Sequence, residues 1–173
     1  MDKIIISMMA AISLDGLISI GESSPVTFTS LEDKALLREK IQEADCLLLG
    51  RKTYELSRSI LGKRSCIVFS RSASYSDLND SVINNLHNYG QKFLLLGGSQ
   101  IYHWFLNRGL VDELYLTVEP LVLAQGVPLL SDSCRINNLQ LISVKAINDQ
   151  GTLFLHYLAC KQSLQGRLTA GSV

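Results

Sequence analysis

Proline, charge and paired cysteines are scarce in this chain of 173 residues. Only 3 residues are proline and 18% are charged, whereas 47% are hydrophobic, which excludes a disordered, collagen-like or linker-rich chain. Lys plus Arg number 16, as do Asp plus Glu, so no net charge favours nucleic acid or an anionic membrane as a partner. The length suits one compact domain, which we expect over residues 1–161, with a flexible tail over 162–173.

Neither a metal site nor a secretion signal is favoured. The cysteines Cys46, Cys66, Cys134 and Cys160 form no C-x-x-C pair and have no nearby His, so we expect no metal and interpret them as reduced thiols of a cytoplasmic protein. The apolar run 4–12 follows Lys3 and resembles a short signal peptide, but it is also typical of a strand buried on both faces, which we favour. It is too short to span a bilayer.

Several common catalytic motifs are missing. The chain contains no G-x-G-x-x-G fingerprint and no G-x-x-x-x-G-K-[ST] loop, so neither an ordinary Rossmann dehydrogenase nor a P-loop NTPase is supported. It has no G-x-S-x-G elbow, and its three histidines are scattered, which argues against a hydrolase. The zinc signature of nucleobase deaminases is also absent.

The chain does contain apolar runs that alternate with helical patterns. This alternation predicts an α/β fold with a central mixed, mostly parallel sheet flanked by helices. Two later strand-like segments flank the turn residues 148–151 and predict a C-terminal antiparallel hairpin. Ser30 followed by Asp33 resembles a capping box at the start of the first helix. We expect strands at 4–12, 46–49, 66–69, 93–96, 114–118, 139–147 and 152–160, and helices at 31–44, about 77–86 and 99–109.

Three glycine-bearing junctions follow predicted strands, where ligands bind in open α/β sheets. At 13–16, Asp15 and Gly16 place a carboxylate in a tight turn, and turn chemistry alone explains them equally well. At 50–55, backbone N–H groups with Arg51 and Thr53 would hold a phosphate, although a basic helix start is often only solvated. At 97–102, two glycines would let a diphosphate approach a helix start, and a capping turn is the alternative.

These motifs, taken in order, resemble the superfamily of dihydrofolate reductases and riboflavin-pathway pyrimidine reductases. The similarity covers about residues 3–160. It is strongest to the reductase domain of the riboflavin deaminase-reductase and its stand-alone relatives. It implies a three-layer fold with NADPH lying across the carboxyl ends of the strands. The motifs are 13–16 (SLDG), 45–55 (DCLLLGRKTYE), 97–102 (GGSQIY), 110–114 (LVDEL), Pro120 and 126–129 (GVPL).

The resemblance also implies roles for single residues. Cofactor phosphates would bind to Gly50, Arg51 and Thr53, and the adenosine 2′-phosphate would bind to Ser70 and Arg71. The diphosphate and nicotinamide would lie on Gly97, Gly98, Ser99, Gln100, Ile101 and Tyr102. The nicotinamide and substrate would also lie near Ser13, Asp15 and Gly16. Asp15 is the expected catalytic residue, helping to move a proton. A homodimer is expected from the relatives and from the apolar stretch 121–124.

The sequence departs from the family pattern at positions that concern the substrate. Met9 and Ser57 stand where riboflavin reductases commonly have Lys and Asp, and the Pro-Trp of dihydrofolate reductases is missing. Dihydrofolate reductases also have an acid on the helix that follows the first strand, and Glu32 or Asp33 could supply this carboxylate. We interpret both as ordinary N-terminal helix acids favoured by the helix dipole. We therefore expect an NADPH-dependent reductase of a pyrimidine or pteridine-like heterocycle, and a ribosylaminopyrimidine phosphate is the substrate that we favour. The alternatives are a dihydrofolate reductase and a nucleotide-binding module without turnover.

Overall fold

The computed structural model describes residues 3–21, 26–72, 74–130 and 138–160. The tail predicted at 162–173 and the thiol of Cys134 lie outside these ranges. Cys46, Cys66 and Cys160 are free thiols. Within the described ranges, no helix is long and apolar enough to cross a membrane.

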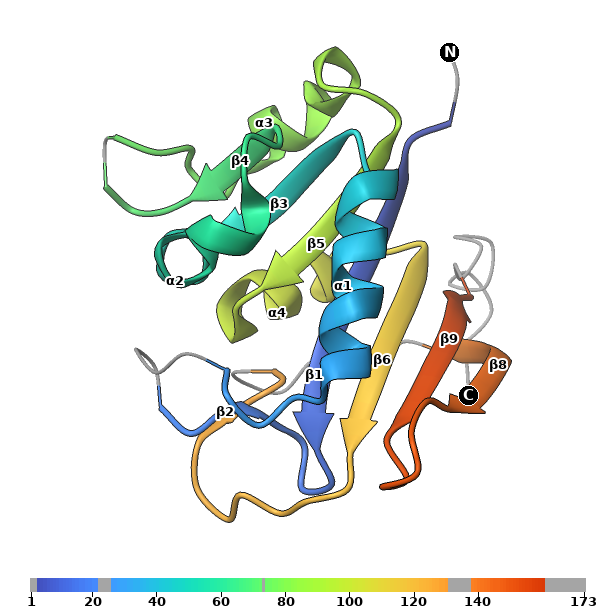
Figure 1. The fold of residues 1–173 in the computed structure, drawn as a ribbon. Coiled ribbons are helices and arrows are strands. Elements are labelled where there is room, and N and C mark those ends of the chain that lie inside the picture. Colours follow the sequence, from blue (N-terminus) through green and yellow to red (C-terminus); the bar gives the residue numbers. More distant parts are fainter. Residues whose placement is uncertain (1–2, 22–25, 73, 131–137, 161–173) are drawn as a thin grey trace, which may run out of the picture.

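The described strands include seven that form one sheet in the order β4-β3-β5-β1-β6-β9-β8 (Figure 1). The first five of these run parallel, β9 runs antiparallel to β6, and β8 runs antiparallel to β9. This confirms the mostly parallel sheet with a C-terminal antiparallel hairpin. The strands are β1 (Ile5–Ser13), β3 (Cys46–Gly50), β4 (Cys66–Phe69), β5 (Lys92–Gly97), β6 (Glu113–Glu119), β8 (Leu139–Ala146) and β9 (Leu153–Ala159).

Helices cover both faces of the parallel part of the sheet. Alternation along β1 sends Met8 to one face and Met9 to the other, because successive strand residues point in opposite directions. The Met8 face packs against α3 (Asp80–Asn84) and α4 (Ser99–Asn107), and the Met9 face packs against α1 (Leu31–Glu43) and α2 (Arg51–Leu61). The apolar run at 4–12 is therefore a strand packed on both faces, as predicted.

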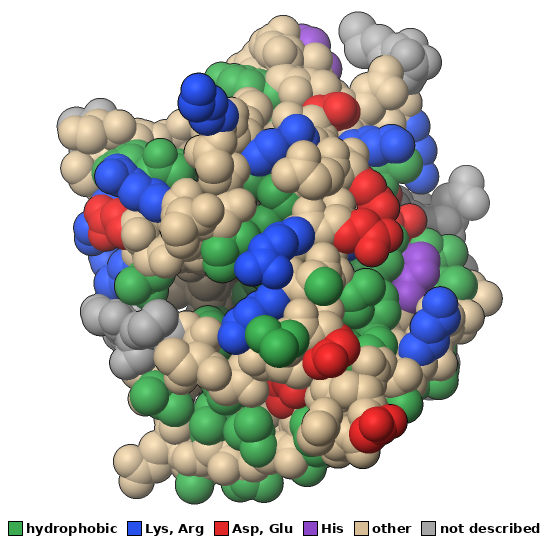
Figure 2. Space-filling model, in the orientation of Figure 1, with side chains coloured by type: hydrophobic (Ala, Val, Ile, Leu, Met, Phe, Trp, Pro, Cys, Tyr) green, Lys and Arg blue, Asp and Glu red, His purple; other side chains and the backbone are tan. Residues whose placement is uncertain are grey.

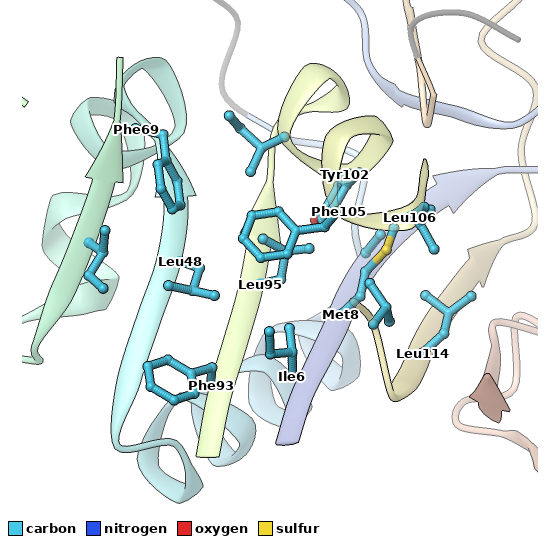
Figure 3. Packing of buried hydrophobic residues seen from close by; sticks show 14 of the residues in the cluster. Ile6, Met8, Leu48, Phe69, Phe93, Leu95, Tyr102, Phe105, Leu106 and Leu114 are labelled. Carbon is cyan, nitrogen blue, oxygen red and sulfur yellow. The ribbon is translucent and has the colours of Figure 1, made fainter. Parts of the chain in front are cut away.

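Aromatic and aliphatic side chains of α4 fill the larger core (Figure 3). Phe105 is fully buried and makes edge contacts with Phe69 and with Trp104, at centroid distances of 5.9 and 5.2 Å. Each such pair contributes about 0.5–1.5 kcal/mol beyond area burial. This packing holds the start of α4 at the carboxyl end of β5.

Two short features differ from the sequence prediction. The helix expected at about 77–86 is only α3 followed by a 3₁₀ turn, Leu86–Asn88. A two-stranded sheet of β2 (Leu17–Ser19) and β7 (Val127–Pro128) was not predicted, because strands of two and three residues carry no periodicity to detect. Gly126 allows this pairing, since a Cβ there would lie 2.1 Å from the Ser19 carbonyl oxygen.

Candidate active site

A cleft of about 2140 Å³ lies beyond the carboxyl ends of β4, β3, β5 and β1. Small-molecule pockets are typically about 300–1000 Å³, so this cleft has room for a dinucleotide and a second molecule. Figure 2 shows a hollow in the face that carries α1 and α2, with Lys and Arg side chains along its rim. The lining residues fall within the segments 9–11, 18–21, 26–29, 33–41, 50–61, 69–72, 75–79, 96–102 and 125–128.

The second and third glycine junctions meet inside this cleft. A Cβ on Gly50 would lie 3.2 Å from Ile101 Cγ1, and one on Gly98 would lie 3.6 Å from Thr53 Oγ1. Neighbouring parallel strands end at the same edge, so β3 and β5 bring these two loops together. The predicted cofactor residues Gly50, Arg51 and Thr53 therefore share one wall of the cleft with Gly98 to Tyr102.

Two helix N-termini face the cleft without a side-chain cap. Helices α2 and α4 begin after Gly50 and Gly98, neither of which supplies a capping hydrogen bond, whereas Ser30 caps α1 and Asn79 caps α3. The first N–H groups of a helix need an acceptor from outside the helix and carry a partial positive charge. The cleft wall is thus suited to an anion such as a diphosphate.

Gly97 packs against Tyr102 at the base of this wall. Gly97 has φ +87°, and a Cβ there would lie 2.6 Å from the Tyr102 ring, so only glycine fits. The Tyr102 hydroxyl donates to the Met9 carbonyl at 2.5 Å, and burial raises the pKa of this phenol. Tyr102 is therefore a neutral, fixed side chain at the cleft floor.

The polar groups of the cleft fit a phosphate-bearing dinucleotide. The Ser99 hydroxyl at the start of α4 is buried and has no partner among the described residues. Arg71 lies with Ser70 on the rim after β4, is exposed, and forms no ion pair with any residue of the described ranges. Arg51 instead pairs with Glu55 at 3.0 Å. No group of three His, Cys, Asp or Glu within the described residues could hold a metal ion.

The first junction lies apart from the cleft. Ser13, Asp15 and Gly16 are not among the lining residues, and Asp15 accepts hydrogen bonds from the N–H groups of Leu123 (3.1 Å) and Ala124 (2.8 Å). The Ser13 hydroxyl is the main influence that lowers the pKa of Asp15. Through these two hydrogen bonds, the Asp15 carboxylate connects the turn after β1 to the loop after β6. The catalytic role predicted for Asp15 has no support in this geometry.

Among the described acids that line the cleft, Asp33 is buried, whereas Glu55 and Asp77 are exposed. Asp33 is 4% exposed, and burial raises its pKa above the ordinary 3.8. The charge of Glu119 acts in the same direction, while the hydroxyls of Thr117 and Thr29 oppose it. The interpretation of Asp33 as an ordinary helix-start acid is therefore wrong, because β6 and the cleft remove it from solvent.

Thr117 completes this corner of the cleft. Its side chain is fully buried, and its Oγ1 has no partner within hydrogen-bond distance among the described residues, although the hydroxyl faces the Asp33 carboxyl closely enough to lower the pKa of that acid. Buried polar atoms without partners are rare and call for an explanation. A ligand that bonds to Asp33 would also meet the Thr117 hydroxyl. The sequence signal for this corner was the acid three residues after Ser30, which predicts a cap and not a cleft group.

Comparisons with known proteins agree with the fold. A family model for dihydrofolate reductase matches residues 5–121. Dihydrofolate reductase type 1 of Escherichia coli is 32% identical over 127 residues, covering 66% of this chain and 76% of that protein. The structure resembles a Thermotoga maritima diaminohydroxyphosphoribosylaminopyrimidine deaminase/5-amino-6-(5-phosphoribosylamino)uracil reductase, with TM-score 0.72, 15% identity, and coverage of 91% of this chain and 57% of that one.

A solved dihydrofolate reductase also shares the fold. The Enterococcus faecalis enzyme complexed with NADP(H) gives TM-score 0.65 at 17% identity, covering 90% of this chain and 96% of that one.

Proposed function

Since the chain belongs to the dihydrofolate reductase family, we propose that it is an NADPH-dependent reductase of a pyrimidine or pteridine-like heterocycle. The observation that carries this proposal is the buried carboxyl of Asp33 beside the buried Thr117 hydroxyl, in a cleft with room for two ligands. A positioned acid of raised pKa is typical of proton transfer near neutral pH.

The two uncapped helix starts would hold the cofactor. The N-termini of α2 and α4, with Thr53 and the Ser99 hydroxyl, would bind the diphosphate, and Arg71 with Ser70 would bind the 2′-phosphate. NADPH supplies the hydride when bound. Tyr102 and the Gly97–Gly98 wall would fix the position of the nicotinamide half beside β1.

Asp33 and Thr117 would bind the substrate ring. A carboxylate accepts two parallel hydrogen bonds from a ring N–H and a neighbouring amino group, which fits a 2-aminopteridine. The Thr117 hydroxyl would take the remaining amino hydrogen. In its protonated form Asp33 would then supply, directly or through one water, the proton that a reduced C=N bond requires.

A dihydropteridine such as dihydrofolate is the first substrate to assay. Asp33 is a buried acid on the first helix, as this substrate needs, and the E. coli relative at 32% identity bears the dihydrofolate reductase name. A ribosylaminopyrimidine phosphate is the second candidate, supported by the fold shared with the T. maritima enzyme. Met9 and Ser57 weigh against it, since neither supplies the charge expected for that reaction.

The test follows NADPH absorbance with each candidate in turn. Asp33→Asn should lower kcat/KM by about 10²–10⁴-fold, the range for losing a positioned acid. Glu32→Gln is the matched control, because it removes a neighbouring exposed carboxylate from the same helix turn and should leave turnover unchanged. Saturable NADPH binding without oxidation of any heterocycle would leave the binding-module alternative in place. Equal losses in both variants would remove Asp33 from the proposal.

A further inference from the structure

The helix start that carries Asp33 is capped by a residue from a distant strand. The Ser30 hydroxyl accepts from the Asp33 N–H at 3.2 Å, as in a capping box. In that motif the third helical residue, here Asp33, accepts the N-cap N–H in return. Instead, the Ser30 N–H and hydroxyl both donate to Glu119 Oε1, at 2.6 and 2.8 Å. Glu119 therefore takes the place that Asp33 would have in the cap.

Glu119 is a buried carboxylate surrounded by donors. It lies at the end of β6 and is 3% exposed, and its Oε2 accepts from the Thr152 hydroxyl at 2.8 Å. Asn148 holds Thr152 through bonds to its N–H (3.0 Å) and its hydroxyl (2.9 Å) in the β8–β9 turn. Burying a carboxylate is costly unless hydrogen bonds compensate, and here three donors do so. The hairpin turn and the start of α1 are thereby joined through one side chain.

The two acids of this corner have opposite surroundings. Glu119 receives three hydrogen bonds, while the Asp33 carboxyl is buried, excluded from the cap and open to the cleft. The other charged or titratable groups that face Asp33 are Lys34 of α1 and Tyr102 of α4, and Arg51, Lys52 and Glu55 of α2 line the same cleft.

We propose that Glu119 is a positioning residue for Asp33: it replaces Asp33 in the cap of α1 and so leaves the Asp33 carboxyl available to the substrate. This inference rests on the proposed role of Asp33 in the reduction. Glu119 also favours the protonated form of Asp33, because a second negative charge nearby is repelled. Removing that charge lowers the pKa of Asp33.

Glu119→Gln tests the proposal, because an amide oxygen still accepts from Ser30 while the charge is lost. The titration of Asp33, followed by carboxyl ¹³C NMR and assigned with Asp33→Asn, should shift to lower pH. The falling limb of kcat against pH should shift with it, and kcat at pH 8 should fall at least about threefold, since the protonated fraction drops about tenfold per unit of pKa. An unchanged Asp33 titration would overturn the proposal.

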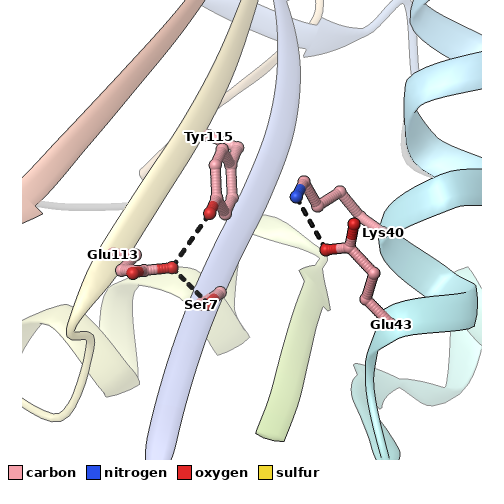
Figure 4. A network of polar contacts seen from close by, with 5 residues as sticks. All are labelled: Ser7, Lys40, Glu43, Glu113 and Tyr115. Atoms are coloured by element: carbon pink, nitrogen blue, oxygen red, sulfur yellow. Dashed lines mark hydrogen bonds and ion pairs between the residues drawn. The ribbon is translucent and has the colours of Figure 1, made fainter. Parts of the chain in front are cut away.

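Glu113→Gln is the matched control from the other end of β6. Glu113 also accepts from two hydroxyls, those of Ser7 and Tyr115, both at 3.0 Å (Figure 4). It does not line the cleft, so its loss should lower stability without moving the Asp33 titration. A shift of the same size in both variants would show a general effect of charge or stability and would refute the positioning role.

Ser30→Ala tests the N-cap of α1 separately from the charge of Glu119. It removes the hydroxyl between Glu119 and Asp33 while the Glu119 charge stays, so kcat and the exchange protection of the Asp33 amide should fall, with no downward shift of the Asp33 titration. Unchanged protection and kcat would contradict the proposal, even where Glu119→Gln does not fold. The NMR titration needs no substrate, so it tests Glu119 even if no heterocycle is reduced, an outcome that would count only against the proposed function.

Discussion

Gly97→Ala should strongly destabilise the protein. The new Cβ would stand 2.6 Å from two Tyr102 ring carbons, at a φ of +87° that favours glycine. The ring has no room to move, because Tyr102 is 4% exposed and its hydroxyl is bonded to Met9. The backbone conformation costs about 1–2 kcal/mol and the overpacking about 1–3 kcal/mol, so the free energy of unfolding should fall by about 2–5 kcal/mol.

Urea unfolding measures this change, with Gly109→Ala as the control. Gly109 also has positive φ (+63°), but a Cβ there meets nothing within 4 Å, so only the backbone cost of about 1–2 kcal/mol applies. Gly97→Ala should also weaken NADPH binding, measured by fluorescence titration on folded protein, whereas Gly109→Ala should not. Equal losses of stability in the two variants would refute the argument from the Tyr102 contact.

Further predictions concern the cofactor, pH, the first junction and assembly. Arg71→Ala should raise the KM for NADPH about tenfold to a hundredfold and leave that for NADH nearly unchanged, because one charge-assisted bond is worth about 1.5–3 kcal/mol; equal effects on both would contradict the 2′-phosphate role. Because the pKa of Asp33 is raised, the folded state keeps this proton at a pH where the unfolded state has lost it, so the wild type loses stability as pH rises above 3.8 through the folded pKa. Asp33→Asn lacks this loss, so its Tm relative to that of the wild type should be higher at pH 8 than at pH 4. Asp15→Asn should lower the Tm by loosening the loop at 123–124 while kcat is retained, and a large loss of kcat with unchanged Tm would restore its catalytic role. A homodimer remains a prediction, for which Leu141 on the exposed β8 is a candidate contact; light scattering of wild type and Leu141→Asp should show a dimer and a monomer, and a monomeric wild type at all concentrations would exclude it.

Local sequence patterns were enough to predict the parallel sheet, the hairpin and the glycine junctions. Apolar runs such as 46–49 and 93–96 are local patterns, and the structure has strands there as β3 and β5. Because parallel strands end at one edge, the sequence placed both junctions at that edge, and the pairing of β3 with β5 then brings Gly50 against Ile101. These features depend on neighbours in the chain or on general topology.

Long-range contacts, in contrast, set which acid is buried in the cleft. Asp15 and Asp33 each follow a plausible local signal, a turn and a capping box. Asp15 is bonded to amides 108 and 109 residues away, and the cap that Asp33 would complete is taken by Glu119, 89 residues from Ser30. Burial and long-range hydrogen bonds set the pKa values and partners of these carboxyls, and neither leaves a trace in the spacing of nearby residues.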